Sequence, residues 1–268
     1  MGWRRLQHGF TQERIVLSLA VALFALFAAF LPGFATQDNI LSLVRSVSVL
    51  GILGLAMALV VIGRGIDLSL VATMAISVAW TLALAGSGMP MGQAIAYGLL
   101  LAIGVGLVNG VLIAYADIPA LFSTLAMGTF IYGLGRLKLI PSDVVPAPED
   151  VLWFTRIGQG ELLGVPMPVW LFLAVALAGH VFLRHTRAGR FVYALGDNHL
   201  AARITGIPVR PMVVLQYGVA SLIGCIGGLV TAASVSGMNT RIVNSTLIYD
   251  VILVVVLGGI GLSGGKGG

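Results

Sequence analysis

The stretch Met212–Val235, MVVLQYGVASLIGCIGGLVTAASV, contains no charged side chain and is apolar along most of its length. A helix rises about 1.5 Å per residue, so roughly 20 apolar residues cross the hydrocarbon core of a lipid bilayer. The apolar residues are continuous and do not alternate with polar ones, which favours a membrane helix over a strand of a membrane barrel. Within lipid, a helix also satisfies its backbone N–H and C=O groups internally. The stretch therefore predicts a transmembrane helix.

Seven more stretches of this kind occupy most of the remaining chain. They are Ile15–Pro32, Leu41–Ile62, Leu68–Ala85, Met91–Tyr115, Ala120–Leu134, Val169–Leu183 and Leu247–Leu262. Hydrophobic residues make up 58% of the 268 residues and charged residues only 9%, and the mean hydropathy is +1.03. A soluble domain has about 25% charged residues, so this chain lacks the charge to cover a water-facing surface. We predict an all-α polytopic membrane protein, with residues 1–268 as one transmembrane domain of eight helices.

The distribution of arginines predicts how the spans are oriented. Arg4, Arg5 and Arg14 precede the first span, and no small-residue cleavage site follows it, so we expect a retained helix with a cytoplasmic N-terminus. Alternation of the spans then places loop 184–211 in the cytoplasm and loop 135–168 outside. The first loop has five arginines and one acidic residue, whereas the second has four acidic and three basic residues. This difference agrees with the positive-inside rule.

The stretch Gly65-Ile66-Asp67-Leu68-Ser69 lies between the second and third spans. The Asp67 carboxylate either caps the third span, where it complements the helix dipole, or lies on a solute path or gate, since acids near membrane depth are usually functional. The two interpretations are compatible. Asn109, deep in the fourth span, either forms a hydrogen bond between helices or lines a polar cavity. We therefore treat Asp67, Ser69 and Asn109 as candidate path or gate residues.

The hydroxyl residues of the fifth span are weaker candidates for a solute path than Asp67, Ser69 and Asn109. Ser123 and Thr124 can donate to carbonyl groups of their own helix. A hydrogen bond of that kind satisfies the hydroxyl without any partner on another helix. We therefore assign neither residue a role in the path.

The segment Arg190–Pro208 in loop 184–211 is unusually ordered for a connector. Asp197 or Asn198 can cap a short helix over His199–Thr205, and Gly206 can end that helix in the left-handed conformation. A short capped helix is suited to docking, whereas the alternative is a solvated linker whose arginines only set the topology. The candidate docking residues are Gly196, Asp197, Asn198, His199, Ala201, Ala202, Arg203 and Gly206.

Loop 135–168 contains five prolines, which prevent long regular structure there. We expect either a short helix around Glu149–Thr155 on the membrane surface, with Trp153 and Phe154 at the interface, or an ordinary connector. At the other end of the chain, the stretch Gly264–Gly268 follows the eighth span directly. We expect the protein to be truncated there, with further helices after this stretch.

The sequence predicts no enzyme active site, metal site or cofactor site. The four histidines lack the spacing of metal ligands; they are His8, His180, His185 and His199. Lys266 does not belong to a phosphate-binding loop, because Ile260 occupies the first glycine position of that motif and Gly267 its Ser/Thr position. No basic soluble face is present that would bind nucleic acid.

The chain contains five motifs that are weak individually but specific in their combination and order. They are Gly65-Ile66-Asp67-Leu68-Ser69, His185–Arg190, Ala194–Asn198, Ala201–Ile207 and Val256–Gly259. Through them the chain resembles, over nearly its whole length, the membrane permease subunits of bacterial ABC importers for simple sugars, the ribose, xylose, arabinose and autoinducer-2 group. Family members often have a glutamate after the asparagine, where this chain has His199 and Leu200. The resemblance therefore implies the docking helix without that acidic contact.

The resemblance implies a ten-helix type II importer-like permease of the bacterial inner membrane, of which eight helices are present here. It implies a second permease copy, identical or a sister subunit, two cytoplasmic ATP-binding subunits and a periplasmic solute-binding protein. It also implies that the helix within 196–206 is the coupling helix that docks on the ATPase. ATP hydrolysis would then belong to the partner, and the permease would move a monosaccharide or a related small polar solute.

An ion-coupled secondary transporter of a small solute is the main alternative. Such a transporter normally carries ionisable residues in the middle of its spans, whereas Asp67, Asp117 and Asp250 fall near span ends. A membrane enzyme would need a polar catalytic cluster, and a structural scaffold would have no use for a coupling loop. The sequence favours the ATP-driven importer.

Overall fold

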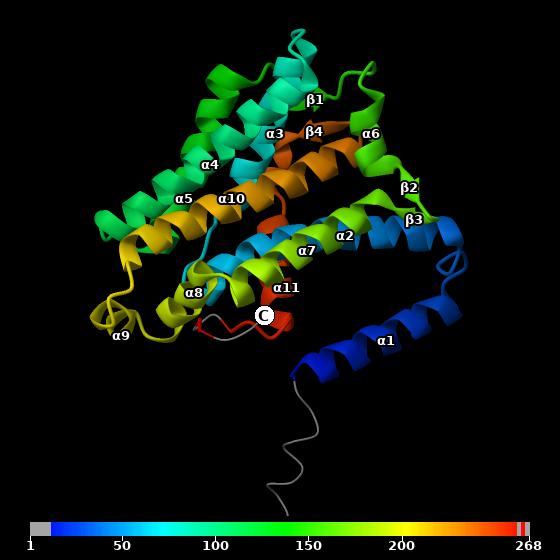
Figure 1. Ribbon diagram of the computed structural model, residues 1–268. Coiled ribbons are helices and arrows are strands. Elements are labelled where there is room, and N and C mark those ends of the chain that lie inside the picture. Colours follow the sequence, from blue (N-terminus) through cyan, green and yellow to red (C-terminus); the bar gives the residue numbers. More distant parts are fainter. Residues whose placement is uncertain (1–11, 262–263, 266–268) are drawn as a thin grey trace, which may run out of the picture.

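The computed structural model describes residues 12–261 and 264–265, which form a bundle of helices with a few short strands (Figure 1). The long helices are α1 (Gln12–Phe30), α2 (Gln37–Ile62), α3 (Leu70–Gly86), α4 (Met91–Tyr115), α5 (Ala120–Leu134), α7 (Met167–His185), α10 (Val209–Ser234) and α11 (Leu247–Leu257). Each predicted span overlaps one of these helices. The all-α prediction is confirmed for the part of the chain that the structure describes.

The remaining elements are short and connect the long helices. They are the π-helix η2 (Gly135–Leu139), β1 (Val144–Pro146), α6 (Leu152–Gln159), β2 (Glu161–Leu162), β3 (Val165–Pro166), α8 (Arg187–Asp197), α9 (His199–Ile204), β4 (Gly237–Asn239) and the 3₁₀ helix η3 (Thr240–Asn244). The arginines Arg4 and Arg5, which enter the orientation prediction, and Lys266 lie outside the described residues.

Five of the described helical segments are long and apolar enough to cross a membrane: α2, α4, α5 together with η2, α7 and α10. The apolar helices α3 and α11 and the described apolar part of α1 are shorter. The predicted span Leu247–Leu262 was too long, because α11 ends at Leu257 and Gly259 takes a left-handed φ of +89°. Glycine adopts that conformation without a steric penalty, so the helix stops there.

The core of the bundle surrounds α3, most of whose residues are buried. Helix α10 packs against α2, α3 and α4, and α2 also packs against α7 and α11; Figure 1 shows α10 crossing the bundle with α4 and α5 on one side and α2 and α7 on the other. Helices α4 and α10 approach closely at Gly110, where an added Cβ would lie 2.5 Å from the Val214 Cα atom. Small residues permit this approach between membrane helices.

The short elements gather at opposite ends of α10. One end, called the α9 end, contains α8 and α9, which precede α10 in the chain. The other end, called the β1–β4 end, contains the antiparallel pair β1 and β4, with Val145 opposite Met238, and the β2–β3 hairpin.

The short helix predicted around Glu149–Thr155 is present as α6, shifted to Leu152–Gln159. The placement of Phe154 at the membrane interface was wrong: its side chain is 1% exposed, whereas Trp153 is 50% exposed. Phe154 is buried because α6 packs on the end of α10, where an added Cβ on Gly158 would overlap the backbone of Ser234.

Candidate functional site

Residues 63–69, between α2 and α3, are not helical, and we call this segment the break. Ser69, at the end of this break, is hydrogen-bonded to Asn109, which lies about 9 Å along α4 from that helix's end at Tyr115. The break therefore reaches into the bundle at Asp67 and Ser69, which are buried, whereas Arg64 is exposed. Non-helical backbone at membrane depth is tolerated only where protein or a water-filled cavity surrounds it. The structure must therefore supply partners for the exposed backbone groups.

The carbonyl groups at the end of α2 all have partners. Gln216 of α10 donates from Nε2 to the carbonyl oxygens of Leu59 at 2.5 Å and Val60 at 3.0 Å. Backbone N–H groups of the break bond to Val60 and Val61, and the Gly265 N–H group bonds to Ile62 at 2.8 Å. A helix that ends leaves its last four carbonyls without helical partners, so this set completes the end of α2.

Side chains from α5 and α10 also satisfy the middle of the break. The Leu68 N–H group donates to Thr124 Oγ1 at 3.1 Å, and the Tyr217 hydroxyl donates to the Ile66 carbonyl at 3.2 Å. Arg64 has a left-handed φ of 65°, a conformation that costs a non-glycine residue roughly 1–2 kcal/mol. Such residues persist where the surrounding structure imposes the conformation, and they cluster at clamps and switches.

The three candidate path or gate residues lie together in this break. Asp67 Oδ1 accepts hydrogen bonds from the Ser69 N–H group at 2.9 Å and the Ser69 hydroxyl at 2.5 Å. Asn109 donates to Ser69 Oγ at 2.8 Å and accepts from the Ser123 hydroxyl at 3.5 Å. Asp67, Ser69 and Asn109 are each 0% exposed. The network joins the start of α3 to α4 and α5.

The capping interpretation of Asp67 holds in a modified form. Its carboxylate accepts from Ser69, the residue before α3, and not from the N–H groups of the first helical turn. Its second oxygen, Oδ2, is buried and accepts no hydrogen bond from the described residues. The interhelical role considered for Asn109 is confirmed by its bond to Ser69.

Sequence reasoning missed three residues that support the break. Thr124 was discounted because it can bond to its own helix, and it does donate to the Ala120 carbonyl at 2.8 Å. The same oxygen nevertheless accepts from Leu68. Gln216 and Tyr217 form an adjacent polar pair in the uncharged stretch of α10, and such a pair in a membrane helix is the signal that would have identified them.

The α9 helix has the caps that the sequence predicted. Asn198, and not Asp197, is the N-cap: its Oδ1 accepts from the N–H groups of Leu200 and Ala201, each at 3.0 Å. Gly206 follows the helix with a φ of +82°. The Ile207 N–H group then bonds back to the Ala202 carbonyl at 3.1 Å, the pattern by which a left-handed residue ends a helix.

The candidate docking residues do not all face outward. His199, Ala201 and Arg203 are exposed on α9. Ala202 is only 4% exposed and packs into an apolar cluster, and Gly196 is also buried. The large apolar side chains exposed on α9 are Leu200 and Ile204, at 71% and 86% exposure, and their spacing of four places them on one face of the helix. The sequence analysis had not singled them out.

A charged groove runs beside α9. Its volume is about 350 Å³, and its lining includes His199, Arg203, Arg210 and, from the turn between α4 and α5, Asp117. The Arg210 guanidinium lies 5.4 Å from the centre of the Tyr115 ring, within the range of a cation–π interaction. The α9 end therefore presents an apolar helix face next to a groove with more cations than anions.

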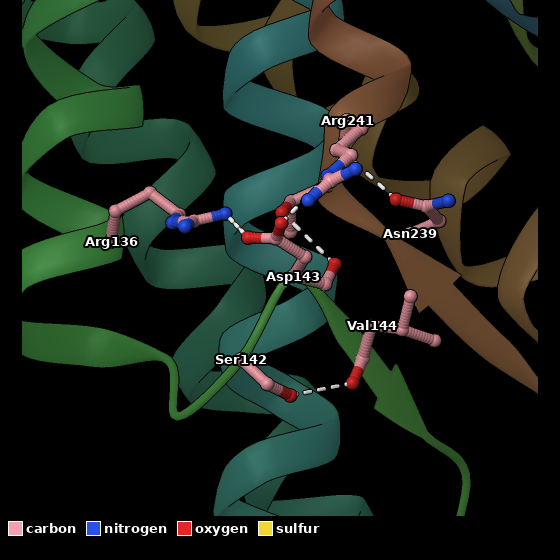
Figure 2. A network of polar contacts seen from close by, with 7 residues as sticks. Arg136, Ser142, Asp143, Val144, Asn239 and Arg241 are labelled. Carbon is pink, nitrogen blue, oxygen red and sulfur yellow. Dashed lines mark hydrogen bonds and ion pairs between the residues drawn. The ribbon is translucent and has the colours of Figure 1, made fainter.

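At the β1–β4 end, Asp143 connects three segments (Figure 2). Its carboxylate pairs with Arg136 of η2 and with Arg241 of η3, the latter at 2.6 Å between Oδ2 and Nε. Its backbone carbonyl accepts from the Thr240 N–H group at 2.8 Å and the Thr240 hydroxyl at 3.0 Å. These bonds extend the β1–β4 pairing, so this end of the bundle is held by contacts far apart in the sequence.

Among the described residues, no group of three or more His, Cys, Asp or Glu side chains is arranged to hold a metal ion. The polar groups of the break are instead engaged mainly in hydrogen bonds between helices. The arrangement is suited to a hinge or gate in a membrane bundle.

Comparison with known proteins agrees with a transport function. The family described as the permease component of the branched-chain amino acid transport system matches residues 39–265. The ribose import permease RbsC of Escherichia coli K12 is 33% identical over 267 residues, covering 99% of this chain and 83% of the relative. RbsC of Haemophilus influenzae is 31% identical over 257 residues, covering 96% of this chain and 79% of the relative.

A third relative is the L-arabinose ABC transporter permease AraH of Azospirillum brasilense, 33% identical over 252 residues, covering 93% of this chain and 73% of the relative. No solved structure matches the chain significantly. The family match includes the break, α9 and the residues of α4, α5 and α10 that form hydrogen bonds with the break or with the end of α2. The chain therefore belongs to this family of ABC transporter permease components, as a multi-pass membrane subunit.

Proposed function

We propose that the protein moves a monosaccharide, or a related small polar solute, through the bacterial inner membrane as the permease subunit of an ATP-driven importer. The relatives named for ribose and L-arabinose support this substrate class. The observation that carries the mechanism is the capped helix α9, with its exposed apolar face at one end of the bundle. The names of the relatives favour an ATP-driven importer over the ion-coupled alternative.

In this proposal the α9 end, within loop 184–211, faces the cytoplasm and docks on an ATP-binding subunit. Leu200 and Ile204 fill an apolar surface of that partner, and Arg203 and His199 contribute polar contacts. The β1–β4 end and loop 135–168 face the periplasm, where a solute-binding protein docks. A second permease copy completes the path. The N-terminus lies in the cytoplasm, and ATP is hydrolysed by the partner.

The break at 63–69 is the gate in this mechanism. The Ser69 hydroxyl of the break is hydrogen-bonded to α4, and the break backbone is hydrogen-bonded to α5 and α10, so a shift of these helices changes its position. Moving a two-state equilibrium from 1:99 to 99:1 requires about 5.5 kcal/mol of differential binding. ATP and the two partners supply this by binding one state more tightly than the other.

The function is tested by reconstitution. The complete importer, with its ATP-binding subunits and solute-binding protein, is placed in vesicles and supplied in turn with radiolabelled ribose, arabinose, fructose and a branched-chain amino acid. We expect uptake of one of the sugars that requires both ATP and the binding protein. Uptake by the permease alone, driven by an ion gradient without ATP, would defeat the proposal.

The orientation predicts which ends of the protein are labelled from outside the cell. In a Cys225→Ala background, cysteine is placed at Ile204 of α9 or at Leu163 between β2 and β3, each 86% exposed. A membrane-impermeant maleimide added to spheroplasts should label Leu163→Cys and leave Ile204→Cys unmodified until the membrane is opened. Labelling of Ile204→Cys in intact spheroplasts would reverse the orientation and remove the ATPase contact.

A further inference from the structure

Three backbone segments meet at the end of α2. The Ile62 carbonyl oxygen accepts a hydrogen bond from the Gly265 N–H group at 2.8 Å. Gly196, in the last turn of α8, lies against the same oxygen, and a Cβ added to Gly196 would overlap it. That Cβ would also lie 2.5 Å from the Gly265 nitrogen, and a Cβ on Gly265 would lie 2.7 Å from the Asp197 Cα atom.

This contact has no side chain in it. Two glycines, Gly196 and Gly265, let the backbones of α8 and of the C-terminal stretch touch the end of α2 directly. A side chain between two elements can absorb a displacement by changing its rotamer, whereas a close-packed backbone contact transmits strain. The contact is therefore stiff.

An apolar cluster holds the same segments together. It contains Leu59 and Ile62 of α2, Val192 and Leu195 of α8, Ala202 of α9, and Val209 and Met212 of α10. The cluster fixes α8 and α9 to the end of α2, so the exposed face of α9 and the Ile62 carbonyl belong to one packed unit. A force on α9 reaches α8 through this packing.

The break begins at the residue that follows Ile62. Five residues after Ile62, Asp67 begins the polar network that reaches Ser69 and Asn109. Gly264 also approaches the break: an added Cβ on it would lie 3.1 Å from the Arg64 nitrogen. The Gly196 contact therefore connects α8 and α9 to the end of α2, where the break begins.

We propose that Gly196 is a positioning residue that acts inward, and that its backbone contact with the Ile62 carbonyl passes displacement of α8 and α9 to the break at 63–69. This rests on the proposed function, in which α9 receives force from an ATPase. It assigns Gly196 a role different from contact with that partner, since the residue is buried against α2.

Gly196→Ala tests the proposal in the complete importer. The added methyl group forces α8 away from the end of α2. We expect uptake per ATP hydrolysed to fall about 2- to 30-fold, the range of coupling changes caused by single substitutions, while ATP hydrolysis itself persists. Wild-type uptake per ATP in a folded Gly196→Ala complex would overturn the proposal.

Gly98→Ala is the matched control. Gly98 lies on α4 and packs on α3, where its added Cβ would overlap the Thr81 hydroxyl and lie 2.9 Å from the Ser77 carbonyl oxygen. The substitution therefore creates a similar overlap between two helices, away from α8, α9 and loop 135–168. It should lower thermal stability and leave uptake per ATP unchanged. An equal loss of uptake per ATP in both variants would mean that any such overlap uncouples transport, and would overturn the specific role of Gly196.

A second measurement tests the proposal without the Gly196→Ala substitution, for the case in which that variant fails to accumulate in the membrane. Cysteine at Ile66 in the break, or at Ile204 on α9, is placed in a Cys225→Ala chain that keeps Gly196. Maleimide reactivity is compared between the nucleotide-free importer and the importer trapped with ATP and vanadate. The proposal requires both sites to change, and a change at Ile204 without one at Ile66 would overturn it. A wild-type importer without ATP-driven uptake would instead contradict the proposed function.

Discussion

Gly206→Val is expected to lower uptake per ATP hydrolysed by roughly 5- to 30-fold while the protein still inserts into the membrane. Gly206 has a φ of +82°, and no atom lies within 4 Å of the position of its Cβ. The effect is therefore conformational and not steric. Holding a residue with a side chain in this region costs roughly 1–2 kcal/mol, which corresponds to a factor of about 5–30 in an equilibrium constant. The end of α9 should rearrange, and docking on the ATPase should weaken.

Gly88→Val provides the matched control for this prediction. Gly88 lies in the turn between α3 and α4, with a φ of +98° and no atom within 4 Å of its Cβ position. The substitution imposes a similar backbone penalty away from α9. It should affect stability without changing uptake per ATP. If the two valine variants lose coupling equally, strain in the bundle is responsible and α9 has no special role.

Gly206→Asn separates conformation from other effects. Asparagine enters the left-handed region more readily than other residues with a side chain, so this variant should recover most of the coupling. ATP hydrolysis and sugar uptake are measured on the same vesicles. A Gly206→Asn importer as impaired as Gly206→Val would show that glycine is needed there for a reason other than its backbone conformation.

The sequence predicted the structural elements that are stabilised by interactions between residues close together in the chain. Continuous apolar stretches gave the long helices, because each span satisfies its own backbone. The end of α9 was predictable for the same reason: Asn198 and Gly206 act on N–H and C=O groups within a few residues of themselves. The position of Asp67 between two spans also marked the break.

The contacts that support the break were less predictable, because they join residues far apart in the chain. Gln216 donates to Leu59, 157 residues away, and the Asp143–Arg241 pair spans 98 residues. Phe154 was placed at the interface because its packing on α10 leaves no local signal. Nothing in residues 196–206 alone indicates that Gly196 faces α2 while Leu200 faces outward, since that depends on how α8 docks.

Gln216→Leu is expected to destabilise the protein by about 1–3 kcal/mol, the usual cost of leaving a buried hydrogen-bonding group unpaired. The substitution keeps a similar volume but removes the amide that donates to the carbonyls of Leu59 and Val60. Val60 retains the bond from the Gly65 N–H group, so the Leu59 carbonyl suffers most. Because the end of α2 is the start of the break, uptake should fall together with stability. Thermal denaturation in detergent and uptake in vesicles measure the two effects.

Gln159→Leu is the control for Gln216→Leu, because it removes a glutamine amide that is exposed and not buried. Gln159 also donates from Nε2 to a backbone carbonyl of the bundle, that of Ser234 at 3.2 Å, but it is exposed at the β1–β4 end. Water can replace its bonds, so the change in stability should stay within about 0.5 kcal/mol. If Gln216→Leu is as stable and as active as Gln159→Leu, the break does not depend on the Gln216 amide. In that case the helix end at Ile62 is set by the Gly63–Ser69 backbone itself, and the gate must be sought among Asp67, Ser69 and Asn109 alone.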